Sequence, residues 1–140
     1  MFTSISARSA SAYKQVSLET SVNTADSHQQ VNLMFDGLLF SVGAARMALS
    51  HGDVPTKGMH INRAVRILSE GLLSTLDFEK GGELATNLKN VYDACLLRLT
   101  QANFYNDDAA LAEVARMIKP VADAWKEIGG PGKAAMSQTH

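Results

Sequence analysis

Residues 76–125 read LDFEKGGELATNLKNVYDACLLRLTQANFYNDDAALAEVARMIKPVADAW, and this stretch decides the fold. Apolar residues recur in it at the spacing of one helix face, in two runs separated by the polar residues 105–108. Asn106 and Asp107 in that break are residue types that end one helix and cap the next. A short link makes consecutive helices antiparallel neighbours. The stretch therefore predicts a helical hairpin, with helices over about 82–104 and 107–128.

Two further helical patterns precede this hairpin. The first is expected over about 27–50, with Thr24 or Ser27 as its cap and Gly52 just beyond its end. The second is expected over about 55–76, and Pro55 suits its first turn, where a missing N–H loses no helical partner. Four helices with short links predict an all-α fold, an antiparallel four-helix bundle. Pro120 is expected to bend the last helix or to cost it a hydrogen bond.

The two ends of the chain differ from the middle in composition. Residues 1–22 are rich in Ser and Ala and have few bulky side chains, so we expect a mobile or weakly docked arm. A short helix around residues 10–18 of that arm is an open alternative. The expected organisation is therefore an N-terminal arm (1–22), a helical bundle domain (23–128) and a disordered tail (129–140).

The chain offers little material for catalysis. Its net charge of −1 at pH 7 gives no basic field for nucleic acid or anionic lipid, and no uninterrupted apolar run reaches membrane-spanning length. The single cysteine, Cys95, falls on a predicted core face, where a thiol is inert. None of the four histidines follows a Glu by three residues, and no glycine-rich phosphate loop occurs. We therefore expect no metal, no cofactor and no enzyme activity, and a helical enzyme with an unrecognised site is the least favoured hypothesis.

The first three helices have more apolar surface than a minimal bundle needs. In the first helix, one face carries the expected core, and Leu33, Phe40 and Met47 form a second stripe at seven-residue spacing. Either the arm or a neighbouring helix covers this stripe, or the stripe belongs to a groove for an apolar partner helix. Both interpretations stay open at the level of periodicity, because a helix packed on two sides has the same pattern.

The same stretch carries an ordered set of motifs that resembles one protein family. The motifs are Leu76-Asp77, Glu79-Lys80-Gly81-Gly82-Glu83, Ala85-Thr86-Asn87-Leu88, Tyr92, Arg98-Leu99, Ala102-Asn103, Asn106-Asp107 and Ala124-Trp125. Together they resemble the FliS family of export chaperones for flagellin. The similarity is densest over 67–128 and extends loosely back to Ala12-Tyr13.

The resemblance implies a fold and a function. Members of the family are cytoplasmic four-helix bundles that bind the disordered C-terminal segment of flagellin, prevent its premature polymerisation and assist its delivery to the export gate protein FlhA. They are not enzymes. Tyr13 matches the family's N-terminal tyrosine, so the resemblance implies that it anchors or gates the groove when flagellin is absent.

The apolar stripes and the resemblance together predict a binding surface and leave one rival function. The predicted flagellin groove consists of Tyr13, Leu33, Phe40, Met47, Ile67, Leu68, Leu72, Leu84, Leu88 and Tyr92. The rival is a structural or regulatory bundle that self-associates through the same stripes, and a homodimer in the absence of flagellin fits both hypotheses.

Overall fold

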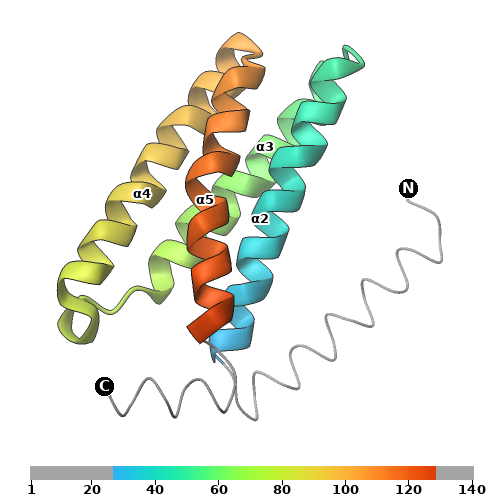
Figure 1. Ribbon diagram of the computed structural model, residues 1–140. Helices are drawn as coiled ribbons and strands as arrows, with labels where there is room; N and C mark the ends of the chain where they lie inside the picture. The colour runs from blue at the N-terminus through green and yellow to red at the C-terminus, as the bar shows by residue number, and fades with distance from the viewer. Residues whose placement is uncertain (1–26, 129–140) are drawn as a thin grey trace. The chain divides into compact units, whose positions relative to one another are not determined.

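The structure, a computed structural model, describes residues 27–128 (Figure 1). Its elements are α2 (Ser27–Ser50), α3 (Val54–Arg66), the π-helix η1 (Ile67–Leu72), the 3-10 helix η2 (Leu73–Thr75), α4 (Phe78–Tyr105) and α5 (Asp108–Ile128). No strand occurs in this range. The predicted all-α class and four-helix bundle are confirmed, whereas the predicted arm and tail lie outside the described residues.

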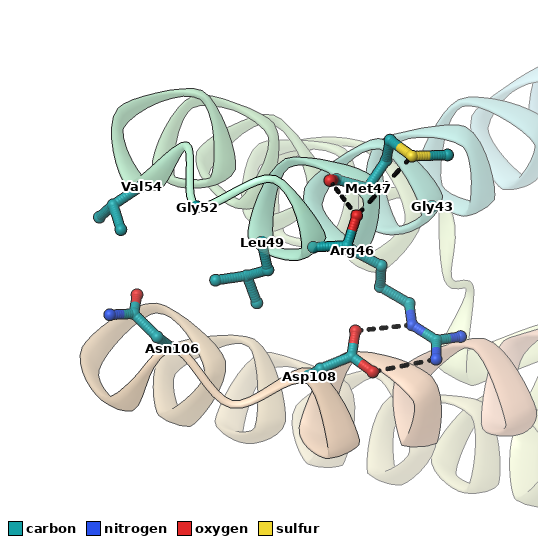
Figure 2. Close-up of a pocket in the computed structure, with 9 residues that line it drawn as sticks. Gly43, Arg46, Met47, Leu49, Gly52, Val54, Asn106 and Asp108 are labelled. Atoms are coloured by element: carbon teal, nitrogen blue, oxygen red, sulfur yellow. Dashed lines mark hydrogen bonds and ion pairs between the residues drawn. The ribbon is translucent and has the colours of Figure 1, made fainter.

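From Val31 onward the helices form one unit in which each helix runs antiparallel to the next. Phe40 of α2 contacts His60 of α3, with ring centroids 6.3 Å apart. The Lys57 ammonium of α3 bonds the carbonyl oxygen of Asn103 in α4 at 2.9 Å. Ion pairs join α4 to α5 (Arg98–Glu113, 2.8 Å), α5 to the end of α2 (Arg46–Asp108, 2.8 Å; Figure 2) and α5 to the start of α2 (Asp36–Lys126, 3.5 Å). The bundle order is therefore α2–α3–α4–α5, closed by α5 against α2.

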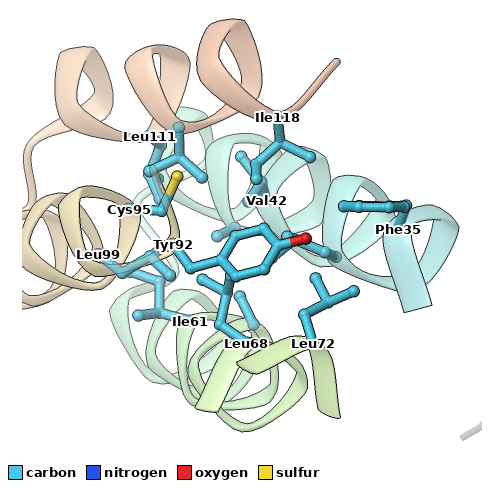
Figure 3. Close-up of a cluster of buried hydrophobic side chains, with 14 of the residues drawn as sticks. Phe35, Val42, Ile61, Leu68, Leu72, Tyr92, Cys95, Leu99, Leu111 and Ile118 are labelled. Carbon is cyan, nitrogen blue, oxygen red and sulfur yellow. The ribbon is translucent and has the colours of Figure 1, made fainter. Parts of the chain in front are cut away.

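The core runs along the axis of the bundle and receives side chains from every helix (Figure 3). Its largest fully buried side chains are Phe35, Leu38, Val42, Ile61, Leu68, Leu72, Cys95, Leu99, Leu111, Val114 and Ile118. Tyr92 is only 2 % exposed, and its ring centroid lies 6.5 Å from that of Phe35. Burial raises the pKa of the Tyr92 phenol to about 12. Apolar burial of this extent is the main stabilising contribution to such a bundle.

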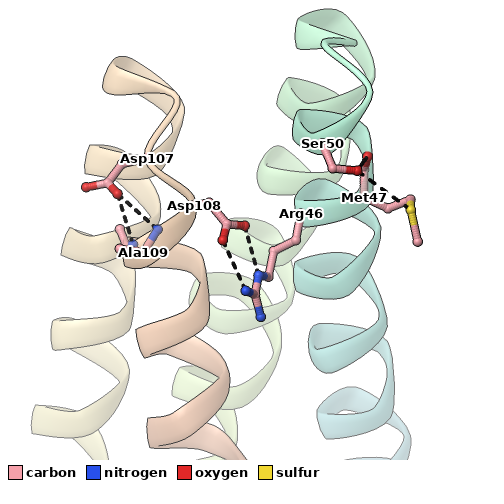
Figure 4. Close-up of polar contacts among 7 residues, drawn as sticks. Arg46, Met47, Ser50, Asp107, Asp108 and Ala109 are labelled. Carbon is pink, nitrogen blue, oxygen red and sulfur yellow. Dashed lines mark hydrogen bonds and ion pairs between the residues drawn. The ribbon is translucent and has the colours of Figure 1, made fainter.

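Aspartate side chains cap three of the helices. Asp53 accepts a hydrogen bond from the Thr56 backbone N–H at the start of α3, and Asp77 accepts from Glu79 and Lys80 at the start of α4. Asp107 accepts from the backbone N–H groups of Ala109 and Ala110 at 3.0 and 3.3 Å (Figure 4). These bonds satisfy N–H groups that have no partner inside a helix. The predicted roles of Gly52 and Pro55 are also confirmed, because Gly52 has φ +72° and Pro55 lies in the first turn of α3.

The second predicted helix departs from the α-helical expectation after Arg66. It continues as a π-helix over Ile67–Leu72 and a 3-10 turn over Leu73–Thr75. Ser69 donates its hydroxyl hydrogen to the Val65 carbonyl, and Thr75 donates its own to the Leu72 carbonyl. Such side-chain bonds compete with the backbone ladder and favour irregular winding. The π-helix is a feature that hydrophobic periodicity alone does not reveal.

The third and fourth predicted helices need smaller corrections. Gly82 has φ +51° and ψ −122°, so it kinks α4, and the helix begins one turn earlier than expected, at Phe78. This backbone region is open to glycine and strained for other residues. α5 continues through Pro120 without a break.

α2 meets the length and hydropathy criteria for a membrane-crossing helix, although the sequence has no uninterrupted apolar run of that length. One face of α2 is nevertheless part of the core, because Phe35, Leu38 and Val42 are at most 1 % exposed. A core helix of a helical bundle meets the same criteria, and the buried face of α2 accounts for part of its apolar composition.

Replacing Asp107 by alanine is expected to lower the free energy of unfolding by about 1 kcal/mol, because two backbone N–H groups of α5 lose their acceptor. Urea denaturation followed by circular dichroism measures this change. Asp123→Ala is the matched control, since it removes only an exposed pair with Lys119 at 3.4 Å and is expected to cost about 0.3 kcal/mol. Equal losses in the two variants would contradict the capping role of Asp107.

Candidate partner-binding face

The four seams between neighbouring helices differ in polarity. Both seams that involve α5 are bridged by ion pairs, Arg46–Asp108 and Asp36–Lys126 on one side and Arg98–Glu113 on the other. Arg46 donates two hydrogen bonds to Asp108, and this lowers the pKa of the Asp108 carboxyl below its usual value. Among the described residues, no ion pair crosses the two seams on either side of α3. The two seams beside α3 are therefore the ones that no ion pair closes within the described residues.

An open hollow of about 490 Å³ lies at the seam between α2 and α3. We call this surface the α2–α3 groove; it consists of Met34, Gly37, Phe40, His60, Arg63, Arg66, Ile67, Glu70 and Gly71. Two glycines face side chains across it: a methyl group on Gly37 would lie 3.3 Å from Ile67 Cδ1, and one on Gly71 would lie 2.8 Å from Met34 Sδ. At both positions a side chain of the facing helix stands where a methyl group would need space, so the glycines keep extra bulk out of the groove floor.

A second hollow of about 490 Å³ lies at the seam between α3 and α4. We call it the α3–α4 groove; it is lined by Ile61, Asn62, Val65, Leu99, Thr100, Asn103 and Phe104. Phe104 is 78 % exposed, which is unusual for a side chain of its size and polarity. At the same seam Lys57 is buried, and Asn103 accepts from its ammonium through both the carbonyl oxygen and Oδ1.

The third hollow, of about 840 Å³, lies at the end of the bundle beside the α2–α3 turn (Figure 2). Met47 lines it together with Arg46, Asp108 and Val54. Ser50 and His51 both bond the Met47 carbonyl oxygen, and this fixes the last turn of α2. The ion pair Arg46–Asp108 lies on the wall of this hollow.

The structure separates the predicted groove residues into four groups. Phe40, Met47 and Leu84 are exposed by 61–63 %. Leu33, Ile67 and Leu88 are half-buried. Leu68, Leu72 and Tyr92 are at most 2 % exposed and belong to the core, so they present no surface to a partner in this structure. Tyr13 lies outside the described residues.

Only part of the predicted set is brought together. Phe40 and Ile67 lie in the α2–α3 groove, while Met47 lines the hollow at the bundle end. Leu84 and Leu88 belong to α4, which does not neighbour α2 in the bundle order. Whether each of these residues contacts a partner stays a prediction.

Sequence reasoning missed several residues of the α2–α3 groove, among them Gly37, His60, Arg63 and Gly71. The two glycines could have been found from the sequence, because they lie inside predicted helices. A glycine inside a helix costs about 1 kcal/mol relative to alanine and often marks a close approach of two helices. The signal for His60 and Arg63 was weaker, because exposed polar residues occur on every surface helix.

His60 and Cys95, which belong to the helices that form the grooves, have shifted pKa values. Burial, and next the charge of Arg63, lower the pKa of His60, and its Nδ1 is buried without a hydrogen-bond partner. Burial raises the pKa of the Cys95 thiol to about 12. Within 27–128 no three His, Cys, Asp or Glu side chains gather closely enough to hold a metal ion.

Comparison with known proteins gives one consistent result. The family described as flagellar protein FliS matches residues 9–131. The flagellar secretion chaperone FliS of Salmonella typhimurium is 45% identical over 117 residues, covering 84% of this chain and 87% of that protein. The FliS of Escherichia coli is 36% identical over 86% of this chain and 89% of its own length. FliSB of Pseudomonas aeruginosa is 39% identical, over 83% of this chain and 91% of its own.

Proposed function

This chain belongs to the FliS family of flagellar secretion chaperones, and from that premise we propose that it binds the C-terminal segment of flagellin on the face centred on α3. The observation that carries the proposal is the pair of grooves on either side of α3, which expose Phe40 and Phe104 and are crossed by no ion pair among the described residues. Exposed large apolar side chains beside grooves of this kind are typical of a site for another macromolecule.

The shape of the grooves suits an amphipathic helix. A partner helix places apolar side chains at three- and four-residue spacing, and a seam between two helices accepts such a row. A segment that is disordered when free then folds as it binds, and the ordering cost offsets part of the apolar gain. While the segment is held, its apolar stripe is covered and unavailable for flagellin–flagellin packing. Binding alone therefore accounts for protection against premature polymerisation.

The remaining parts of the function follow from the same proposal. The protein acts in the cytoplasm, before export, and performs no chemistry on flagellin. It delivers the bound flagellin toward the export gate protein FlhA. Tyr13 and the rest of the N-terminal arm compete with flagellin for part of the groove, which limits binding to other apolar segments.

A polymerisation assay tests this function directly. Light scattering follows the assembly of flagellin monomers after seeding, with and without the purified chain. We expect an equimolar amount of the chain to suppress assembly, and flagellin that lacks its C-terminal segment to show no binding. Assembly at an unchanged rate, with the chain in excess and folded, would contradict the proposal.

A second candidate function is self-association, which the exposure of Phe40 and Met47 by 63 % and 61 % also favours. Sedimentation with and without flagellin separates the two. A dimer that persists when flagellin is in excess supports a structural or regulatory bundle, whereas a dimer that flagellin dissociates supports the chaperone.

Replacing Gly37 by alanine is expected to weaken flagellin binding by about threefold to tenfold, because one methyl group in the wrong place in an apolar site costs about 1 kcal/mol. The added methyl would lie 3.3 Å from Ile67 Cδ1 and raise the floor of the α2–α3 groove. Calorimetric titration with the C-terminal flagellin peptide measures the affinity.

Gly43→Ala is the matched control, because nothing lies within 4 Å of the added methyl. It is expected to raise the free energy of unfolding by about 0.5–1 kcal/mol through helix propensity and to leave the affinity unchanged. An unchanged affinity in Gly37→Ala would show that the partner does not reach the floor of the groove.

A further inference from the structure

The rim of the α2–α3 groove is charged, although its floor is apolar. Arg63 and Arg66 line the hollow together with Glu70, so cations outnumber carboxylates there. The floor beneath them consists of Met34 and Ile67, next to the two glycines. An apolar floor with a basic rim is complementary to an apolar stripe that has carboxylates beside it.

Arg63 and Arg66 are less engaged in contacts within the bundle than Arg46 and Arg98 are. Arg46 and Arg98 each hold a carboxylate of another helix at 2.8 Å. Arg66 reaches only Glu70 of its own helix, at 3.7 Å, and both side chains are about 70 % exposed (74%/69%). Among the described residues Arg63 has no carboxylate within 4.0 Å. The bundle therefore uses its other interhelical arginines for its own seams and leaves Arg63 available to a partner.

Beside Arg63 in the α2–α3 groove, the side chain of His60 adds no positive charge. The neighbouring His60 packs edge-on against Phe40, and a lowered pKa keeps its imidazole neutral at pH 7. A guanidinium binds a carboxylate through two parallel hydrogen bonds, so it fixes both the position and the direction of the partner group.

We propose that Arg63, supported by Arg66, selects a flagellin helix whose apolar stripe is bordered by an aspartate or glutamate. The proposal rests on the proposed function and specifies the chemistry of the segment that enters the α2–α3 groove. Phe40 and Ile67 take the apolar side chains, and Arg63 pairs with the adjacent carboxylate and sets the register of the bound helix.

The test is a charge-reversal series on the full-length chain, titrated by calorimetry with the C-terminal flagellin peptide. Arg63→Glu is expected to weaken binding by at least tenfold, and Arg63→Gln by about threefold to fivefold. The affinity of Arg63→Gln is also expected to depend less on salt than that of the parent protein. Replacing one peptide carboxylate by lysine is expected to restore binding to Arg63→Glu and to weaken binding to the parent.

The matched control is Arg116→Glu, since Arg116 is an exposed arginine of α5 that lies in neither groove. Thermal unfolding of each variant verifies the fold. Equal weakening by Arg63→Glu and Arg116→Glu overturns the inference, because the change in the net charge of the protein then explains the lost affinity. Tighter binding by Arg63→Glu also overturns it, because Arg63 then serves an acidic residue of this chain, such as Glu19 or Asp26, that competes with flagellin.

The failure of this inference is distinguishable from the failure of the proposed function. If the parent protein binds the peptide and Arg63→Glu binds it equally well, the inference alone is overturned. If the parent protein does not bind the peptide, both are overturned.

Discussion

A Phe40→Glu variant is expected to lose at least 30-fold in affinity for the C-terminal flagellin segment while remaining folded. Burying a phenylalanine against a partner stabilises a complex by about 2 kcal/mol or more, and the introduced carboxylate has to be desolvated without a counterion. The side chain is 63 % exposed in the free protein, so the bundle itself gains little from it. Calorimetry measures the affinity, and circular dichroism measures the thermal unfolding.

Leu97→Glu provides the matched control. Leu97 is also an exposed apolar residue, at 57 %, but it lies on α4 and belongs to neither the α2–α3 groove nor the α3–α4 groove. We expect it to bind flagellin as the parent protein does. Equal losses in the two variants would mean that any added charge disturbs binding, and an unchanged affinity in Phe40→Glu would place the partner elsewhere on the bundle.

A Leu68→Ala variant is expected to lose about 2–5 kcal/mol of its free energy of unfolding, through lost transfer energy and the cavity left behind. Leu68 is fully buried and packs in the core beside Leu72 and Tyr92 (Figure 3). Domains of this size have a total stability of about 5–15 kcal/mol, so the loss is a large fraction of it. Urea denaturation at a fixed pH measures the change.

The control for this variant is Leu84→Ala, which truncates a leucine that is 62 % exposed. It is expected to change the free energy of unfolding by at most about 0.5 kcal/mol. A small effect of Leu68→Ala, together with a large loss of flagellin affinity, would show that Leu68 contacts the partner, as its place in the predicted groove implies, and not the core.

Periodicity and local signals predicted the framework of the bundle. The helix limits follow from residues that end or cap helices. Gly52 and Pro55 separate α2 from α3, and Asn106 and Asp107 separate α4 from α5. These are local effects of backbone conformation and capping, so they can be read from neighbouring residues. The π-helix was missed because hydrophobic periodicity does not distinguish π winding from α winding over so short a segment.

The division between core and groove was harder to predict. Ile67 and Leu68 are adjacent aliphatic residues of one helix, yet Leu68 is fully buried and Ile67 lines a groove. Phe40 was separated correctly from the core face, because its stripe lies opposite Leu38 and Val42. For residues near the edge of a face, such as Tyr92, a difference of one helix position decides between core and surface. Only the packing of the neighbouring helix settles that choice.

The polarity of the seams could not be predicted at all. The pairs Arg66–Glu70 and Lys89–Asp93 follow from the four-residue spacing within one helix. Arg46–Asp108 and Arg98–Glu113 depend on the order of helices around the bundle. That order is what distinguishes the face centred on α3 from the faces beside α5, and hence what locates the candidate site.

The central claim, that the chain binds the C-terminal segment of flagellin, is tested most directly by titrating the purified protein with that peptide from its own organism. Calorimetry at several temperatures is combined with circular dichroism of the same mixtures. We expect saturable one-to-one binding, a negative heat-capacity change from apolar burial and a gain of helix as the peptide folds. No heat of binding and no added helix, with the peptide at tens of micromolar, would contradict it.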